Sequence, residues 1–160
     1  MQIRTATPAD LDAIAAIEAA CFPAAEAATR ASFAARLAVF PRYFWLVEEE
    51  GVLLGFLNGA VIDADVIADA CYENAHCHTP KGAYQTVFGI NTLPEYRGQG
   101  IGGAMLRAMI ETARTEGRKG CILTCKDYLK GYYESFGFVC KGRSASTHGG
   151  AVWNDMILLF

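Results

Sequence analysis

The sequence predicts one α+β domain, with a mixed but mostly antiparallel sheet of about seven strands flanked by about four helices. Two observations indicate this class. Short apolar runs outnumber the segments with helical periodicity, and those helical segments come singly between the strands. Hairpins are expected at both ends of the chain, so the sheet is not the purely parallel, doubly wound kind.

The composition is that of a globular protein with one domain, residues 1–160. Apolar residues make up 52% and charged residues 19% of the 160 positions. The formal charge of −3 favours neither nucleic acid nor an anionic membrane as a partner. The chain starts without a signal segment, and no apolar run approaches the length of a membrane span. We therefore expect a cytoplasmic monomer or homodimer whose six cysteines are reduced.

The first half of the chain is expected to form a strand, two helices and a hairpin. Thr7-Pro8-Ala9-Asp10 has the N-cap residue, the proline and the first-turn acid of a helix start. Glu50-Gly51 is a turn between two apolar runs. The predicted elements are strand Gln2–Ala6, a helix from Thr7 to Cys21, a helix from Thr29 to Phe40, and strands Tyr43–Glu49 and Val52–Ile62.

The second half begins with a polar segment, Asp63–Gly82, which lacks a sustained period and is predicted to be irregular. Long irregular connections in compact domains are often functional. The elements predicted after it are strand Ala83–Thr92, helix Ile101–Glu116, strand Gly120–Cys125, a short helix from Asp127 to Ser135, and strands Phe138–Cys140 and Val152–Phe160.

A glycine-rich loop, Arg97 to Gly103, joins the strand Ala83–Thr92 to the following helix. Glycines let a backbone approach an anion closely, and the first amides of a helix point toward it with the positive end of the dipole. The loop therefore predicts a phosphate site. It also matches the dinucleotide pattern GxGxxG, but Pro94 and further residues separate the strand from the first glycine, which argues against a nicotinamide cofactor.

Arg97-Gly98-Gln99-Gly100-Ile101-Gly102 fits the pattern [Gln/Arg]-x-x-Gly-x-[Gly/Ala] and resembles the pyrophosphate loop of the GNAT superfamily of N-acetyltransferases. Tyr132-Tyr133-Glu134-Ser135-Phe136-Gly137-Phe138 and Ile3 to Asp10 resemble two other family segments, in the right order. The resemblance implies the GNAT fold and acetyl-CoA as cosubstrate, with no metal. It implies that these residues bind the cofactor: Ile90, Asn91, Thr92, Arg97, Gly98, Gln99, Gly100, Ile101, Gly102 and Gly103.

One branch of the superfamily fits better than the others. Leu123 to Tyr128 and His78 to Gly82 resemble the arylalkylamine (serotonin-type) N-acetyltransferases, which suggests an arylalkylamine acceptor. The animal enzymes of that branch carry a His-x-His pair where this chain has Thr86 and Phe88. The acid–base relay built on those histidines is therefore not carried over.

Acetyl transfer needs a group that protonates the departing thiolate and a group that deprotonates the ammonium. Tyr133 matches the family's general acid, and a phenol is protonated at neutral pH. The base is expected among carboxylates and histidines, with Glu26 first because its loop resembles the amine-side lid of related enzymes. The other candidates are Asp63, Asp65, Glu73, His76 and His78.

The run from Cys71 to His78 holds cysteines and histidines but is not expected to bind metal, because neighbouring residues on an extended segment point to opposite sides.

Several functions stay open. The leading one is an acetyl-CoA-dependent N-acetyltransferase acting by direct attack on a primary amine of a small molecule. The alternatives are a protein or peptide N-acetyltransferase, a non-catalytic acyl-CoA-binding or regulatory module, and a nucleotide-dependent oxidoreductase. The sequence does not choose among aromatic amines, polyamines, aminoglycosides and peptide N-termini.

Overall fold

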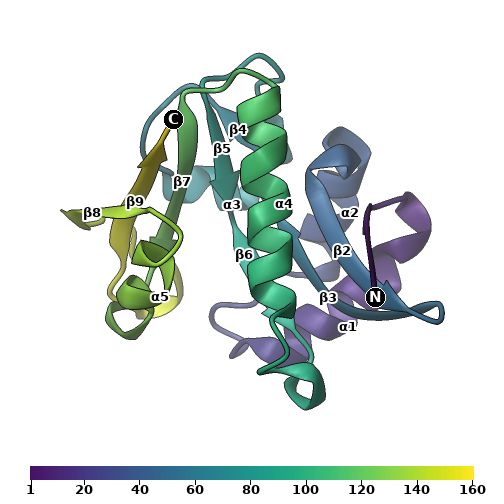
Figure 1. The fold of residues 1–160 in the computed structure, drawn as a ribbon. Helices are drawn as coiled ribbons and strands as arrows, with labels where there is room; N and C mark the ends of the chain where they lie inside the picture. The colour runs from purple at the N-terminus through teal and green to yellow at the C-terminus, as the bar shows by residue number, and fades with distance from the viewer.

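The computed structural model describes residues 1–160 and contains nine strands and five α-helices (Figure 1). The helices are α1 (Leu11–Cys21), α2 (Arg30–Val39), α3 (Asp69–Glu73), α4 (Ile101–Thr115) and α5 (Lys130–Glu134). The strands are β1 (Gln2–Thr5), β2 (Phe44–Glu49), β3 (Val52–Asn58), β4 (Val61–Ile62), β5 (Tyr84–Val87), β6 (Gly89–Thr92), β7 (Gly120–Cys125), β8 (Val139–Arg143) and β9 (Asn154–Leu159).

The α+β class is confirmed. The structure has more strands than expected because two segments that were each predicted as one strand form two strands. Val52–Ile62 forms β3 and β4, and Ala83–Thr92 forms β5 and β6, with a break at Phe88. The segment predicted to be irregular, Asp63–Gly82, contains the short helix α3. The predicted hairpin turn is present, since Glu50 and Gly51 both have positive φ, at 51° and 78°.

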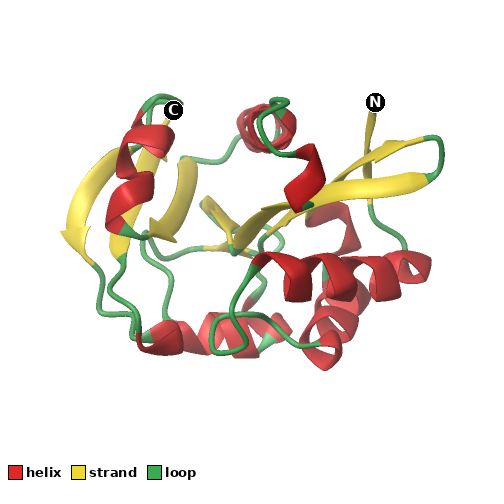
Figure 2. Cartoon of the chain, turned by 90° about the horizontal axis from the view of Figure 1, so that it is seen from below, coloured by secondary structure: helices red, strands yellow, loops and turns green.

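The strands form two sheets, in the orders β1-β2-β3-β6 and β4-β5-β7-β9-β8. All neighbours are antiparallel except β5 and β7, which are parallel. Helix α4 lies on one face of the first sheet, and α1 and α2 cover the other face (Figure 2). None of the helices combines the length and the apolar character needed to cross a membrane. All six cysteines are free thiols.

Part of the hydrophobic core lies between the first sheet and helix α2. Phe33 of α2 packs edge-on against Phe44 of β2 and Phe56 of β3, with ring centroids 6.3 and 5.5 Å apart. All three side chains are fully buried. Burial of aromatic rings contributes most to the stability of such a core. It fixes α2 relative to β3, on which the site depends.

The two sheets separate at Phe88. Before it, β5 pairs with β7 from Tyr84 to Val87. After it, β6 pairs with β3 only and becomes the edge of the first sheet. In a continuous sheet, β6 and β7 would pair with one another. Here those two strand edges are unpaired and diverge.

Gly59, in the bend between β3 and β4, lets that bend approach β5 closely just before the break. A Cβ atom on Gly59 would collide with the backbone carbonyl of Thr86, which cannot move without disturbing β5. We predict that Gly59→Ala lowers the free energy of unfolding by about 1–3 kcal/mol, measured by urea denaturation, because overpacking against backbone is costly.

The matched control is Gly131→Ala in α5, where a Cβ atom meets nothing within 4 Å. That variant should gain about 0.4–1 kcal/mol through the reduced entropy of the unfolded chain. Equal stability of the two variants would contradict the close packing at Gly59.

Candidate functional site

A cleft of about 830 Å³ lies where β6 and β7 separate. One end is the glycine-rich loop, the middle is formed by β6, β7 and α5, and the other end is formed by α1, α2 and the loop after β8. The cleft therefore joins segments from the whole length of the chain. Its size is that of an ordinary small-molecule or cofactor site.

The glycine-rich loop has the geometry of an anion cradle. Gly98 and Gly100 have φ of 79° and 80°, in the left-handed region that glycine adopts without strain. Gly100 is the N-cap of α4, a helix of 15 residues whose first-turn amides face the cleft beside Ile101 and Gly102. The exposed Arg97 adds a positive charge. These features fit the pyrophosphate of coenzyme A.

Strand β6 offers an open edge next to this loop. Leu93 donates its N–H to Leu54 of β3 at 2.9 Å. Because backbone groups alternate along a strand, Asn91 also faces β3, whereas the N–H groups of Ile90 and Thr92 turn toward the opening. The Asn91 backbone is already paired with Phe56, and the Thr92 carbonyl accepts from Cys21 Sγ at 3.3 Å and from Arg97 Nε at 3.2 Å. The pairing of Ile90 and Thr92 with a pantetheine chain stays a prediction.

Tyr133 lies on α5 and lines the cleft. Its side chain is buried, and burial raises the pKa of the phenol well above its usual range. Its hydroxyl forms no hydrogen bond within the protein and so is free to donate to a ligand. Cys125 also lines the cleft, and burial raises the pKa of its thiol to about 11, so it is neutral at neutral pH.

The predicted base candidates are spread over the molecule. Glu26 lies at the cleft, where its Oε1 is 2.7 Å from Lys126 Nζ and its backbone oxygen contacts His148 Nε2 at 2.8 Å. Glu73 also lines the cleft. The structure places four candidates outside it: Asp63, Asp65, His76 and His78.

Two buried charged residues at the inner end were missed by the sequence reasoning. Glu18 and Arg36 are 6% and 4% exposed, and both line the cleft. Burial raises the pKa of Glu18 and lowers that of Arg36 to about 10. The signal was present, because Glu18 follows Ile14 by one helical turn and Arg36 follows Phe33 by three positions. A charged residue at a position on the apolar stripe of a helix indicates a buried charge, and this pattern predicts both residues.

An aromatic wall completes the inner end. Tyr72 stacks on His148 at 5.5 Å and packs against Phe88 at 5.0 Å. The Tyr72 hydroxyl bonds Thr124 Oγ1 at 3.0 Å. Trp153 donates its indole N–H to the His148 backbone oxygen at 2.9 Å. Tyr72, Thr124 and His148 had not been predicted as site residues.

The cysteines and histidines between β4 and β5 do not converge. His78 Nδ1 accepts a hydrogen bond from the Val61 amide at 3.0 Å, and Cys77 contacts the Cys71 carbonyl at 3.6 Å. No group of three or more His, Cys, Asp or Glu residues in residues 1–160 is arranged to hold a metal ion.

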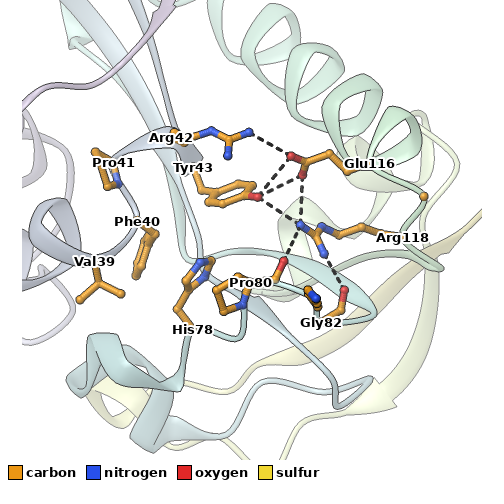
Figure 3. Close-up of a pocket in the computed structure, with 12 residues that line it drawn as sticks. Val39, Phe40, Pro41, Arg42, Tyr43, His78, Pro80, Gly82, Glu116 and Arg118 are labelled. Carbon is orange, nitrogen blue, oxygen red and sulfur yellow. Dashed lines mark hydrogen bonds and ion pairs between the residues drawn. The ribbon is translucent and has the colours of Figure 1, made fainter.

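A second cavity of about 650 Å³ lies at the C-terminal end of α4. Several of its polar side chains bond to one another, since Glu116 accepts from Tyr43 at 3.2 Å, from Arg42 at 3.3 Å and from Arg118 at 3.2 Å (Figure 3). Arg118 also donates to the carbonyl of Gly82 at 2.6 Å. This network ties α4 to the loop before β5, and it leaves no cluster of reactive groups.

Comparison with known proteins identifies a family and an individual relative. A model of the acetyltransferase (GNAT) family matches residues 11–138. The serotonin N-acetyltransferase of Mesocricetus auratus is 28% identical over 109 residues, which are 68% of this chain and 51% of that protein. The chain thus spans about half the length of this curated relative.

Solved structures share the fold over almost all of the chain. The GNAT-like decarboxylase GphF in complex with isobutyryl-CoA has a TM-score of 0.86 at 24% identity, covering 99% of both chains. A GNAT family acetyltransferase from Brucella melitensis in complex with acetyl-CoA has a TM-score of 0.67 at 20% identity, covering 99% of this chain and 87% of that one. At these identities the likeness establishes the fold.

The glycine at the start of α4 provides a test of the anion cradle. In Gly100→Ala, the left-handed conformation at φ of 80° costs about 1–2 kcal/mol, so the loop is expected to leave the geometry that forms the cradle. We predict that affinity for CoA, measured by calorimetry, falls by about tenfold or more.

The matched control is Gly117→Ala, since Gly117 has φ of 76° and lies beyond the other end of α4. Both variants should lose similar stability, but Gly117→Ala should bind CoA as the unmodified protein does. Unchanged CoA affinity in Gly100→Ala would contradict the assignment of the loop.

Proposed function

Because the chain belongs to the acetyltransferase (GNAT) family, whose model matches residues 11–138, we propose that it transfers the acetyl group of acetyl-CoA to a primary amine of a small molecule. One observation carries the proposal. The anion cradle at Gly98–Gly103, the open edge of β6 and Tyr133 line a single cleft. This order matches the order of parts in acetyl-CoA, from pyrophosphate through pantetheine to the thioester.

The proposed reaction is a direct attack in a ternary complex. The amine nitrogen forms a bond to the thioester carbonyl carbon, and the carbon–sulfur bond breaks. Tyr133 gives its hydroxyl proton to the departing thiolate, since this phenol is protonated at neutral pH and its hydroxyl forms no hydrogen bond within the protein. The proton lost by the amine passes to a carboxylate of the cleft.

We propose Glu26 as this carboxylate, since it lies at the cleft and an amine near pKa 10 needs a proton acceptor at neutral pH. Glu18 is the competing group. Its Oε1 has no hydrogen-bond partner of normal geometry, and its raised pKa brings its basicity closer to neutral pH. Each carboxylate has one engaged oxygen, since Glu18 Oε2 accepts from the Ala28 amide at 2.8 Å and Glu26 Oε1 lies 2.7 Å from Lys126 Nζ.

A small molecule is favoured over a polypeptide because two loops meet beside the cleft. The backbone of Glu26, between α1 and α2, contacts His148, between β8 and β9, at 2.8 Å. A Cβ atom on Gly149 would lie 2.5 Å from Glu26 Cγ, so the two loops are closely packed. An extended peptide would have to separate them. The aromatic wall of Tyr72, Phe88 and Trp153, with the serotonin N-acetyltransferase likeness, supports an arylalkylamine as the acceptor.

The first experiment is incubation with acetyl-CoA and a panel of amines, with free thiol as the readout. Amine-dependent release of thiol is expected. Tight CoA binding without release for any amine would favour the alternative, a non-catalytic acyl-CoA-binding module. Release only with peptides would favour a peptide N-acetyltransferase instead.

Removing the Tyr133 hydroxyl tests the proposed acid. In Tyr133→Phe, turnover should fall by about tenfold or more with CoA affinity nearly unchanged, because the hydroxyl acts on the leaving group. In the unmodified protein, turnover should not decline up to about pH 9, since the raised pKa keeps this phenol protonated. Tyr84→Phe, which is outside the cleft, is the control. Equal turnover in the two variants would rule out the role.

Parallel amide substitutions identify the base. Glu26→Gln keeps the shape of the side chain but cannot accept the proton, so kcat/KM should fall by about a hundredfold. Glu18→Gln serves as the comparison, and kcat/KM for both is measured from pH 6 to 9 against the same amine. A loss in Glu18→Gln alone would transfer the role to Glu18.

A further inference from the structure

Arg36 is a buried cation at the inner end of the cleft without an acidic hydrogen-bond partner. It is 4% exposed. Its hydrogen bonds go to neutral groups, from Nη1 to Asn58 Oδ1 at 2.9 Å and from Nη2 to the Tyr72 carbonyl at 2.8 Å. Glu18 acts on it electrostatically but forms no ion pair with it. A buried charge without an ion pair is costly, so a ligand of opposite charge is the natural complement.

A second arginine whose side chain is largely covered shows the contrast. Arg118 lies outside the cleft, with a side chain that is 7% exposed, and it forms an ion pair with Glu116 at 3.2 Å (Figure 3). Its charge is therefore compensated within the fold. Arg36 lies beside a cavity and is not compensated in this way.

The guanidinium of Arg36 is rigidly held. It lies 5.2 Å from the ring centre of Phe33 and 4.8 Å from that of Phe88. Its two hydrogen bonds use two of the five N–H donors that an arginine carries. A fixed, planar fork of this kind binds a carboxylate through paired hydrogen bonds. Although burial lowers its pKa to about 10, Arg36 remains charged at neutral pH.

The position of Arg36 places such a carboxylate close to the reacting end of the cleft. Phe88, on which the guanidinium packs, is the residue at which the sheets separate. Glu18 lines the same cleft, with its buried Oε1 lacking a normal hydrogen-bond partner. The inner end thus presents one cationic and one acidic side chain that are not paired with each other. This arrangement suits a small molecule that carries both an ammonium and a carboxylate.

We propose that Arg36 binds a carboxylate of the substrate, so that the acceptor is an aromatic amino acid, which is an arylalkylamine that also carries a carboxylate. This inference rests on the proposed acetyl transfer for its choice of acceptor. The same carboxylate chemistry has a second source, the acyl group of a thioester such as malonyl-CoA. The experiment separates the two sources.

The test is a calorimetric comparison of two matched pairs of reaction products, each bound to the full chain in the presence of CoA. The pairs are N-acetyltryptophan with N-acetyltryptamine, and N-acetylphenylalanine with N-acetylphenethylamine, which differ only in the carboxylate. The carboxylated member should bind about tenfold more tightly or better, as expected for a charge-assisted pair of hydrogen bonds. Arg36→Met should bring the ratio of the two affinities close to one.

Arg118→Met is the control, because it removes a buried arginine outside the cleft and should lower Tm while leaving the ratio intact. Arg36→Lys is the second variant, since it keeps the charge without the fork and should retain only part of the ratio. It also decides the question if Arg36→Met fails to fold. A ratio near one in the unmodified protein, an unchanged ratio in the Arg36 variants, or no binding of carboxylates at about 10 mM would overturn the proposal.

Malonyl-CoA and acetyl-CoA form the second arm of the experiment. Similar affinities for the two thioesters are expected if the carboxylate belongs to the acceptor. Tighter binding of malonyl-CoA that depends on Arg36, with no ratio in the product pairs, would overturn the amino-acid assignment and give the carboxylate to the acyl group. A failure of the proposed acetyl transfer gives a different result. In that case the affinity ratio of the product pairs still depends on Arg36, but no amine causes release of thiol.

Discussion

The pairing of β5 with β7, and its end at Phe88, is the constraint on which the rest of the structure depends. Up to Val87 the two strands form a parallel pair, and beyond Phe88 the chain remains bonded to β3 alone. The unpaired edge of β6 is stable because α4 and α1 pack on its sheet from opposite faces. The glycine-rich loop follows this edge directly. The end of the β5–β7 pairing therefore creates the cleft and also places the glycine-rich loop at one end of it.

Charge is distributed unevenly along that cleft. The glycine-rich end is open and relies on backbone amides and the exposed Arg97, whereas the inner end is closed and contains the buried Glu18 and Arg36. In a low dielectric, charges act more strongly and over longer distances than at a surface. The outer end is suited to hold a large anionic ligand, and the inner end to choose among small ones.

Much of this was predictable from the sequence, for identifiable reasons. The hairpin, the glycine-rich loop and α4 follow from local signals such as Glu50-Gly51 and the helical period after Gly100. The break at Phe88 has one weak local signal, the following Gly89, and the rest of Ala83 to Thr92 is compatible with a continuous strand. Of the base candidates between Asp63 and His78, only Glu73 lines the cleft, because tertiary packing and not residue type sets the path of an irregular segment. Arg36 meets Phe88 only through the tertiary packing of α2 on β3.

Hydrogen exchange of individual backbone amides, measured with and without CoA, tests the central claim that the open edge of β6 and the glycine-rich loop form the acyl-CoA site. CoA should slow exchange at Ile90 and Thr92 and at the first turn of α4, while Asn91, whose backbone faces β3, changes little. Unchanged exchange at Ile90 and Thr92, or protection confined to the cavity around Arg118, would contradict the account.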